Sequence, residues 1–264
     1  MLDLMKPDVS YFFGFAQADG HLWQGKGNKG KFSIDLMASD RPLLEAFAAL
    51  LPCRTTLHDR TRDTNFKKQF ASSGLLACDR GFREWLKAMG LPSGKKSDIV
   101  GLPLAPFSAV DYFRGWVDAN GSVGITARGF PFVSFSTRSR AVFDGFLGFT
   151  TQTLHTTRST TPNTRDRMFA VAFFKEDAQS IVRALGYETA TLSLQRKRDK
   201  AIALLSWTRP RNMRTKYRAK RWTQADDAVV LSQPVAVAME QLGRTEKSVR
   251  VRLWRLTSSN SDRK

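Results

Sequence analysis

The sequence has little cysteine, no long apolar run and few acidic residues for its size. Its two cysteines, Cys53 and Cys78, favour free, buried apolar side chains in a reducing compartment over a disulfide scaffold. No apolar run reaches the roughly 18 residues that suggest a membrane helix, and the first residues lack the basic and apolar regions of a signal peptide. These absences predict a cytoplasmic or nucleoid-associated protein that is neither secreted nor attached to a membrane.

The shortage of acidic residues leaves a large excess of positive charge. Lys and Arg number 42 against 24 Asp and Glu, so the formal net charge is +18. Because 42% of the 264 residues are hydrophobic, the chain can build packed cores, and the excess charge indicates a polyanionic partner. Nucleic acid fits better than a membrane surface, since no basic amphipathic helix stands out. The alternative is a soluble basic protein without such a partner.

One nine-residue segment occurs twice, as FFGFAQADG from Phe12 and as FRGWVDANG from Phe113, 101 positions later. In each copy two small residues lie four positions apart on one helical face, where they let two helices approach closely. Packing on these faces brings the two ends together, with Asp19 beside Asn120. Small residues at this spacing are common at ordinary helix contacts, but two copies with the same polar-glycine ending indicate an internal repeat. The small residues are Gly14 and Ala18 in the first copy and Gly115 and Ala119 in the second.

The periodicity of apolar residues predicts the same order of elements in each half. Each half is expected to run helix, two strands, helix, two strands, helix, which gives an α+β fold with two related halves. In the first half we expect residues 21–24 to lead through a turn into a strand at 31–36. A helix at 41–51, with Asp40 as N-cap, should follow, and then strands at 53–59 and 65–72 and a helix at 73–89. In the second half we expect strands at 122–126, 130–136, 154–160 and 167–174 and helices at 139–149, 176–185 and 192–207.

Antiparallel strands of this kind bury one face and leave the other in solvent. In both halves the residues predicted to face solvent are rich in Lys, Arg, Ser and Thr, a composition suited to the DNA major groove; the alternative is an ordinary solvated face. The register of 157–159 stays open, because three consecutive residues cannot share one face. The candidate DNA contacts are Lys31, Ser33 and Arg54, with Asp35, Thr56 and His58 on the same face, and Ser134, Arg158 and Arg167, with Ser136, Thr157 and Ser159 nearby.

The repeated segment resembles the LAGLIDADG motif, most clearly at YFRGWVDANGSV from Tyr112 to Val123. Residues 10–207 resemble a single-chain LAGLIDADG homing endonuclease with two motifs. The resemblance implies two pseudo-symmetric αββαββα halves, 1–105 and 106–207, that form a DNA-binding saddle. It also implies a monomer that hydrolyses both strands of a long, asymmetric double-stranded target across the minor groove, with Mg²⁺ or another divalent cation such as Mn²⁺ or Ca²⁺.

The resemblance also assigns a metal site. The acid before the motif's final glycine is the family's metal ligand, and it falls on Asp19 in the first copy and on Asn120 in the second. The expected metal site comprises these two residues with Gly20 and Gly121.

Family members also carry a basic residue in each pocket. Lys96 and Lys197 match this residue best, and Lys95 and Arg196 are the competing candidates. A lysine in the pocket would stabilise negative charge on the phosphate. The alternative roles are a contact with the phosphate backbone or a solvated charge.

Asn120 departs from the motif at its chemically decisive position. An amide ligates through its carbonyl oxygen but carries no charge, so the pair supplies one negative charge instead of two. We therefore expect impaired or single-strand cleavage, whether Asn120 is natural, engineered, or the mark of a scaffold kept only for binding. Asp118 does not replace the missing acid, because a helix turns it about 200° away from residue 120, and Gln17 occupies its place in the first copy.

From residue 208 the composition changes, and 208–264 carry 14 Lys and Arg against 5 Asp and Glu. Residues 208–220 are expected to form a basic linker that follows phosphates, and 221–264 resemble a Myb/SANT-type helix-turn-helix. Thr223, with Asp226, and Thr245 are candidate N-caps. The resemblance implies a third helix in the major groove; the alternative is a helical bundle that binds protein. The candidate DNA contacts are Arg244, Lys247, Arg250 and Arg252.

The leading interpretation is a site-specific DNA endonuclease of LAGLIDADG type with a helix-turn-helix that extends its footprint. The alternative is a non-cleaving DNA-binding regulator, or an intron maturase that binds its host RNA, on the same scaffold.

Overall fold

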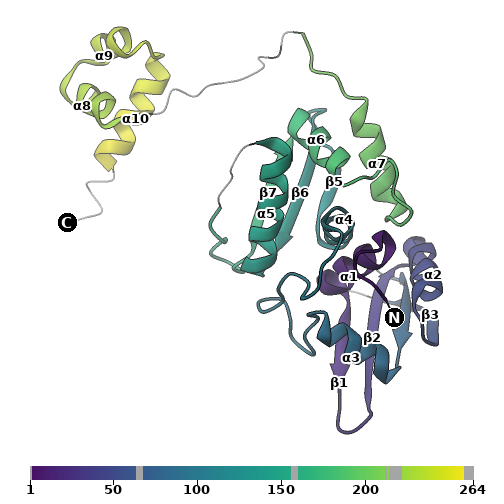
Figure 1. Cartoon of the computed structure of the whole chain (residues 1–264). Coiled ribbons are helices and arrows are strands. Elements are labelled where there is room, and N and C mark those ends of the chain that lie inside the picture. Colours follow the sequence, from purple (N-terminus) through teal and green to yellow (C-terminus); the bar gives the residue numbers. More distant parts are fainter. Residues whose placement is uncertain (1, 64–67, 156–159, 212, 214–221, 259–264) are drawn as a thin grey trace. The chain divides into compact units, whose positions relative to one another are not determined.

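The computed structural model describes residues 2–63, 68–155, 160–211, 213 and 222–258, and the chain falls into two compact units, Met1–Arg209 and Pro210–Lys264 (Figure 1). The first half of the first unit contains α1 (Pro7–Asp19), β1 (His21–Gln24), β2 (Gly30–Met37), a 3₁₀ turn (Ala38–Asp40), α2 (Arg41–Leu50), β3 (Thr55–Arg62), β4 (Phe70–Ala77) and α3 (Arg80–Ala88). The second half contains α4 (Ala109–Asn120), β5 (Ser122–Ile125), β6 (Pro131–Thr137), α5 (Arg140–Leu154), β7 (Phe169–Phe174), α6 (Glu176–Ala184) and α7 (Gln195–Leu205). The second unit contains α8 (Gln224–Ser232), α9 (Val235–Leu242) and α10 (Glu246–Ser258).

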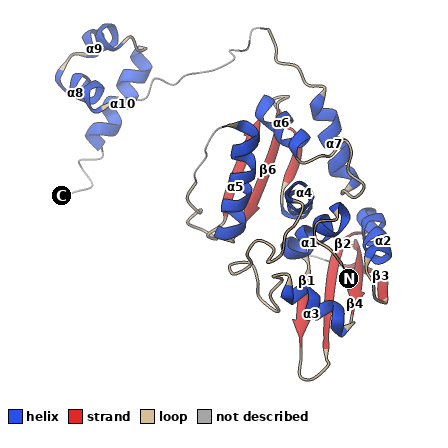
Figure 2. Cartoon of the chain, viewed as in Figure 1, coloured by secondary structure: helices blue, strands red, loops and turns tan. Residues whose placement is uncertain are grey.

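Each half of the first unit builds one antiparallel sheet (Figure 2). The first sheet has the strand order β1-β2-β4-β3, and the second has the order β5-β6-β7. On β2 the apolar residues Phe32, Ile34 and Leu36 are buried and alternate with Lys31 and Ser33, as expected for a strand with one face against the core. The order helix, two strands, helix, two strands, helix is confirmed for the first half, and the α+β class for the unit.

Three local predictions are wrong. Residues 73–77 continue β4 as a strand instead of beginning a helix, because β4 pairs with both β2 and β3 and the two ladders fix its backbone. Leu154 ends α5 instead of beginning a strand, and 156–159, with the predicted contact Arg158, lie outside the described residues. Cys53 and Cys78 are both free, as predicted, but Cys78 is exposed and Cys53 is only partly buried.

The two repeated segments form α1 and α4, which pack against each other through their glycines. A Cβ atom on Gly14 would lie 2.2 Å from the backbone oxygen of Tyr112, and a Cβ atom on Gly115 would lie 2.3 Å from the backbone oxygen of Tyr11. The two contacts exchange equivalent positions of the repeat, so an approximate two-fold axis relates the helices. The close approach predicted from the small residues is confirmed.

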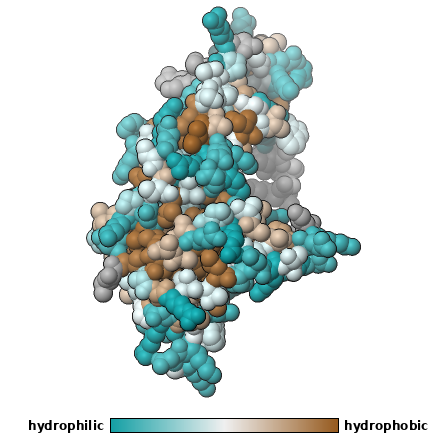
Figure 3. All heavy atoms as spheres, turned by 90° about the vertical axis from the view of Figure 1, so that its right-hand side faces the viewer, coloured by the Kyte–Doolittle hydropathy of each residue, from teal (hydrophilic) through white to brown (hydrophobic). Residues whose placement is uncertain are grey.

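Aromatic side chains fill both cores beside the paired helices. In the first half Phe12 meets Phe32 and Phe47 edge-on, and in the second half Phe135 stacks on Phe146 with 4.0 Å between ring centroids. The face of the chain seen in Figure 3 is largely hydrophilic, with hydrophobic side chains in small groups. No helix among the described residues is long and apolar enough to cross a membrane.

The second unit is a bundle of three short helices. Thr223 begins α8 with a capping box: its hydroxyl accepts from the Asp226 N–H, and the Asp226 carboxylate accepts from the Thr223 N–H. Gly243 ends α9 with a left-handed φ of 58°. The apolar residues of α10 at spacings of three and four join the core of the unit. That core consists of Val230, Ala238, Leu242 and Val249, with Leu253 and Leu256 packed on them.

Candidate functional site

The C-terminal ends of α1 and α4 lie side by side and bring Asp19 next to Asn120. The Asn120 amide donates to the Ala18 carbonyl at 3.4 Å, so the two helix ends meet within the reach of one side chain. Both Asp19 and Asn120 remain in contact with solvent. Crowding of the Asp19 carboxyl by protein atoms nevertheless raises its pKa; Lys96 opposes this shift and Asp35 adds to it.

Gly20 and Gly121 end the two helices for steric reasons. Neither residue has a positive φ, which is −70° at Gly20 and −104° at Gly121, so the backbone turns directly into the following strand. A Cβ atom at Gly20 would lie 2.7 Å from the Ala16 oxygen, and one at Gly121 would lie 2.5 Å from the Ser134 oxygen. The polar-glycine ending of the repeat therefore sets each helix end directly against its sheet.

Lys96 and Lys197 cap the same two helix ends. The buried Lys197 ammonium donates to three backbone carbonyls at the end of α4, at 2.6 to 2.8 Å. The half-buried Lys96 donates to three carbonyls at the end of α1, at 2.7, 3.0 and 3.5 Å. Each lysine thus occupies the negative end of a helix dipole, where a cation is favoured. The acceptors are Val117, Asp118 and Gly121 for Lys197, and Ala16, Gln17 and Ala18 for Lys96.

Burial lowers the pKa of both ammonium groups to about 8. A neighbouring carboxylate opposes the shift in each case, Asp19 at Lys96 and Asp118 at Lys197. With a pKa near 8 both groups stay mostly protonated at neutral pH, as their hydrogen bonds to backbone carbonyls require.

The competing basic residues lie away from the helix ends. Lys95 is exposed, and Arg196 binds the Asp40 carboxylate at 3.0 Å. This ion pair also corrects the prediction for Asp40, whose side chain makes no capping bond to α2 although it precedes the helix. Asp40 instead joins the first half of the unit to the start of α7 in the second half.

Asp118 and its counterpart Gln17 point into the helix interface instead of toward the helix ends. Asp118 accepts from the hydroxyls of Tyr11 at 2.7 Å and Tyr187 at 2.6 Å and from a backbone N–H. Gln17 accepts from the Tyr112 hydroxyl at 2.6 Å, which repeats the Tyr11 contact across the approximate two-fold axis. The prediction that Asp118 points away from residue 120 is confirmed.

The buried tyrosines predict a loss of stability in alkali. Burial, with the Asp118 carboxylate beside them, holds the pKa of Tyr11 and Tyr187 well above 10, and burial also raises the pKa of Tyr112. The unfolded chain releases these protons near pH 10 while the folded chain keeps them, so the free energy of unfolding falls as pH rises through 10. Of the four tyrosines, we expect three to ionise only on unfolding, as followed by tyrosinate absorbance. Reversible ionisation of all four in the folded protein would contradict this network.

The donors at the helix ends fit a divalent cation better on one side than on the other. Asp19 offers an exposed carboxylate, whereas Asn120 offers a neutral amide oxygen, and the Gly121 carbonyl already accepts from Lys197. In the described part of the chain no three His, Cys, Asp or Glu side chains gather closely enough to hold a metal by themselves. A cation at Asp19 therefore needs further oxygen ligands from a bound molecule.

The outward face of the first sheet carries the polar residues expected from alternation. Lys31 and Ser33 face outward on β2, and Arg54 is exposed just before β3. Further side chains that were not predicted lie on this face, where alternation along the paired strands places them. They are His21 and Trp23 on β1 and Arg60 and Arg62 on β3.

The outward face of the second sheet is different. Ser134 and Ser136 lie half-buried on β6, beside Ala172 and Ala170 of β7. None of the residues of β5, β6 and β7 as described is charged. Ser134 and Ser136 lie on the predicted face, and Arg158 lies outside the described residues, so its place on this face stays a prediction. Arg167 is exposed just before β7, with a positive φ of 58°.

Two of the predicted DNA contacts in the second unit make ion pairs within that unit. Arg244 binds Asp226 at 3.1 Å and lies over the Trp222 ring, 3.8 Å from its centroid. Arg252 binds Asp227 at 2.6 Å. Arg252 therefore joins α10 to α8, and Arg244 joins the turn between α9 and α10 to α8.

The other predicted contacts of the second unit face solvent. Lys247 and Arg250 are exposed on α10. Val251, Trp254 and Arg255 are exposed on the same helix, and Trp254 keeps 66% of its surface accessible. These three were not among the predicted contacts. For Arg255 the reason is that a periodic pattern does not distinguish an arginine paired within the unit from one that faces solvent.

Comparison with known proteins identifies the fold of the first unit. No family model matches the sequence, and no curated protein matches it. Among solved structures, the homing endonuclease I-WcaI bound to its DNA recognition sequence has a TM-score of 0.52 and 11% sequence identity, over 76% of this chain and 88% of that one. The chain has the α+β fold of a homing endonuclease. The LAGLIDADG homing endonuclease I-GzeII in complex with its DNA target has a TM-score of 0.44 and 13% identity over 74% and 87% of the two chains. Mesophilic variants of the homing endonuclease I-DmoI have a TM-score of 0.49 and 10% identity over 76% and 98%.

Proposed function

We propose that this chain is a site-specific endonuclease of double-stranded DNA. The observation that carries the proposal is the reciprocal packing of α1 and α4, which gathers Asp19, Asn120 and two lysines at one point. The fold shared with I-WcaI and the net charge of +18 support DNA as the substrate. Because both helix ends belong to one chain, we propose that the protein acts as a monomer on a long, asymmetric target.

Hydrolysis at these helix ends would use a divalent cation, with Mg²⁺ as the candidate and Mn²⁺ or Ca²⁺ as substitutes. Asp19 would hold it together with phosphate oxygens, and Asn120, Gly20 and Gly121 are the remaining candidate ligands. When bound, the cation neutralises phosphate charge and acidifies a water molecule. The two capping lysines would add positive charge beside the phosphate.

We expect Asp19→Asn to abolish cleavage and Asn120→Asp to restore the weaker of the two cuts. Loss of a residue that only supports a metal ligand reduces activity by up to about 100-fold. Because Asp19 is proposed to bind the metal directly, loss of its carboxylate should reduce the nicking rate by at least that factor. Gain of a carboxylate at position 120 should speed cutting of the second strand. The measurement is nicking and linearisation, in Mg²⁺ and in chelator, of a plasmid carrying a duplex selected by the wild-type protein from a random library.

Asp144→Asn on the exposed side of α5 is the matched control, because it makes the same chemical change away from the helix ends. Its rate should equal that of the wild type. If the wild type linearises the plasmid as fast as Asn120→Asp does, the proposal that the Asp19 and Asn120 sites differ in activity is refuted.

The neutral amide of Asn120 also supports a second candidate, a binder that does not cut. In that case the wild type would hold one duplex tightly in Mg²⁺ and leave both strands intact. An intron maturase would instead bind its host RNA and raise its splicing.

For the second unit we propose a DNA contact through the exposed side of α10. Lys247→Ala and Arg255→Ala should each remove one phosphate contact. The slope of log binding constant against log salt concentration should then fall by about one for each variant, and Tm should not change. Arg252→Met should instead lower the stability of the unit, because it leaves Asp227 without this partner. Salt titrations and thermal unfolding of the full chain test both; unchanged slopes would favour a protein-binding bundle.

A further inference from the structure

The turn between β1 and β2 carries exposed lysines at the end of the first sheet. Lys26 and Lys29 lie in the turn, and Lys31 follows on β2. The turn is closed by a bond from the Gly25 N–H to the Lys29 carbonyl at 2.9 Å, and Gly27 has a positive φ of 62°. Because the turn has no apolar side chain of its own, its position depends on contacts from neighbouring elements.

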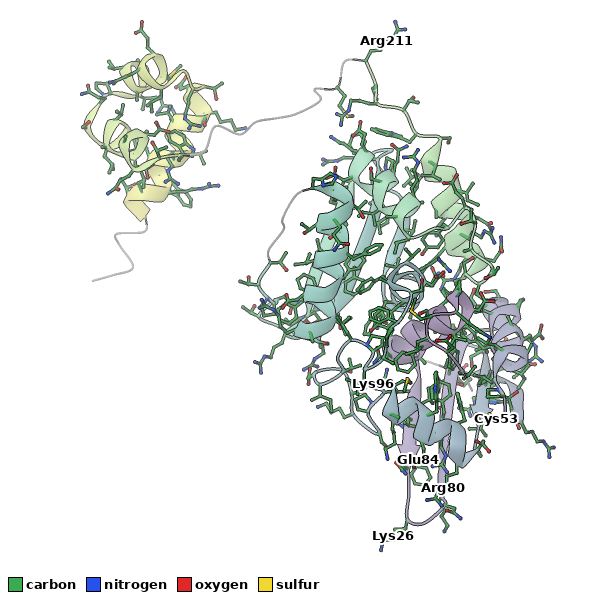
Figure 4. The ribbon with its side chains drawn as sticks, in the orientation of Figure 1. Lys26, Cys53, Arg80, Glu84, Lys96 and Arg211 are labelled. Atoms are coloured by element: carbon green, nitrogen blue, oxygen red, sulfur yellow. The ribbon has the colours of Figure 1, made fainter. Side chains whose placement is uncertain are left out.

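Helix α3 supplies such contacts. An Arg80 N–H donates to the Asn28 side-chain oxygen at 2.8 Å, and an Arg83 N–H donates to the Asn28 carbonyl at 2.8 Å. The Gln24 amide donates to Glu84 at 2.9 Å. Figure 4 shows Arg80 and Glu84 beside the hairpin, with Lys26 at its tip. The turn is therefore held through both the side chain and the main chain of Asn28.

Arg83 is a buried part of this arrangement. It is 1% exposed and also donates to the Cys78 carbonyl at 3.3 Å. A Cβ atom on Gly30 would lie 2.1 Å from its guanidinium, so glycine at this position leaves room for the arginine. Burial of a guanidinium costs free energy unless hydrogen bonds offset it, and here the hairpin provides an acceptor.

The corresponding hairpin of the second half is held differently. Its turn is closed by bonds between Thr126 and Phe130 and by the Gly129 N–H donating to the Thr126 carbonyl. On α6 the position of Arg83 is taken by Gln179, which donates to the carbonyls of Leu204, Leu205 and Trp207 instead of to the hairpin. The arginine one turn later on α6, Arg183, is exposed. The contacts from α3 thus distinguish the first half from the second.

We propose that Arg80 and Arg83 act as positioning residues that fix the β1–β2 hairpin so that Lys26 and Lys29 meet DNA phosphates at the outer end of one half-site. This inference rests on the proposed function. A turn that is already ordered loses less conformational entropy on binding, and phosphate contacts set the register in which the sheet meets the bases. The two arginines would thereby influence specificity without touching DNA.

The test uses the full chain with Arg80→Met and Arg83→Met, and Arg183→Met as the matched control. Amide hydrogen exchange of residues 25–30 in the free protein should speed up in the first two variants and stay unchanged in the control. On a duplex selected by the wild type in Ca²⁺, hydroxyl-radical protection should disappear at the outer end of one half-site. The salt slope of binding should fall by about two, since each phosphate contact contributes about 0.9.

Unchanged exchange of the hairpin in Arg80→Met would overturn the inference whether or not the chain binds DNA, and because Arg80 is exposed, this variant avoids the folding risk of Arg83→Met. Faster exchange with an unchanged footprint and slope would overturn the role in DNA contact. Loss of protection across both half-sites would also contradict it. Failure of the wild type to select any duplex would refute the proposed function, while hydrogen exchange would still decide whether α3 fixes the hairpin.

Discussion

Gly115→Ala is expected to destabilise the first unit by about 3 kcal/mol, the upper end of the range for overpacking of a well-packed contact. The added Cβ would lie 2.3 Å from the Tyr11 oxygen and 2.9 Å from the Phe15 nitrogen. Both atoms belong to the backbone of α1, so no side-chain rotation relieves the clash and one helix must move. Urea unfolding of the full chain, followed by circular dichroism, measures the loss.

Gly148→Ala is the matched control, since Gly148 is also helical but has no atom within 4 Å of its would-be Cβ. There the same substitution should stabilise by up to about 1 kcal/mol, because alanine favours a helix over glycine. Equal effects of the two substitutions would mean that α1 and α4 do not meet through their backbones. Gly14→Ala should behave like Gly115→Ala, because it meets the Tyr112 oxygen in the reciprocal contact.

Lys197→Met is expected to cost about 3 to 5 kcal/mol, the range for loss of a buried charged partner. The ammonium donates to three carbonyls at the end of α4. A methionine of similar length removes this shared donor, and of the three carbonyls Val117 keeps a bond from the Gly121 N–H. Lys96→Met should cost less, about 1 to 2 kcal/mol, because Lys96 is half-buried and water can replace it. Chemical denaturation of both variants measures the difference.

Lys200→Met, an exposed site on the same helix α7, is the control for general effects of losing a lysine. It should leave the free energy of unfolding nearly unchanged. If Lys197→Met proves as stable as the wild type but cleaves DNA poorly, the lysine serves the phosphate and its contact with the helix end contributes little to stability.

The sequence predicts those features that depend on residues close together in the chain, such as the repeated segment and the alternation along a strand. Glycines at the helix crossing and at the helix ends admit no other residue, so they mark both copies of the repeat, and the alternation on β2 follows directly from one buried face. The ion-pair partners of individual charged side chains could not be predicted. Asp40 pairs with Arg196 across 156 positions, and Arg244 pairs with Asp226 instead of facing solvent. Such pairings depend on tertiary distances that carry no periodic signal. The end of β4, residues 73–77, was predicted as a helix for the same reason, since pairing on both sides outweighs local preference.

The backbone contact between α1 and α4 also bears on how such a chain can change. Main-chain atoms, and not interchangeable side chains, determine the separation of the two helix ends. For an endonuclease of the proposed kind, substitutions on the outward faces of the two sheets would alter the recognised sequence while the distance between positions 19 and 120 stays constant. A new target would then keep the same stagger between the cuts in its two strands.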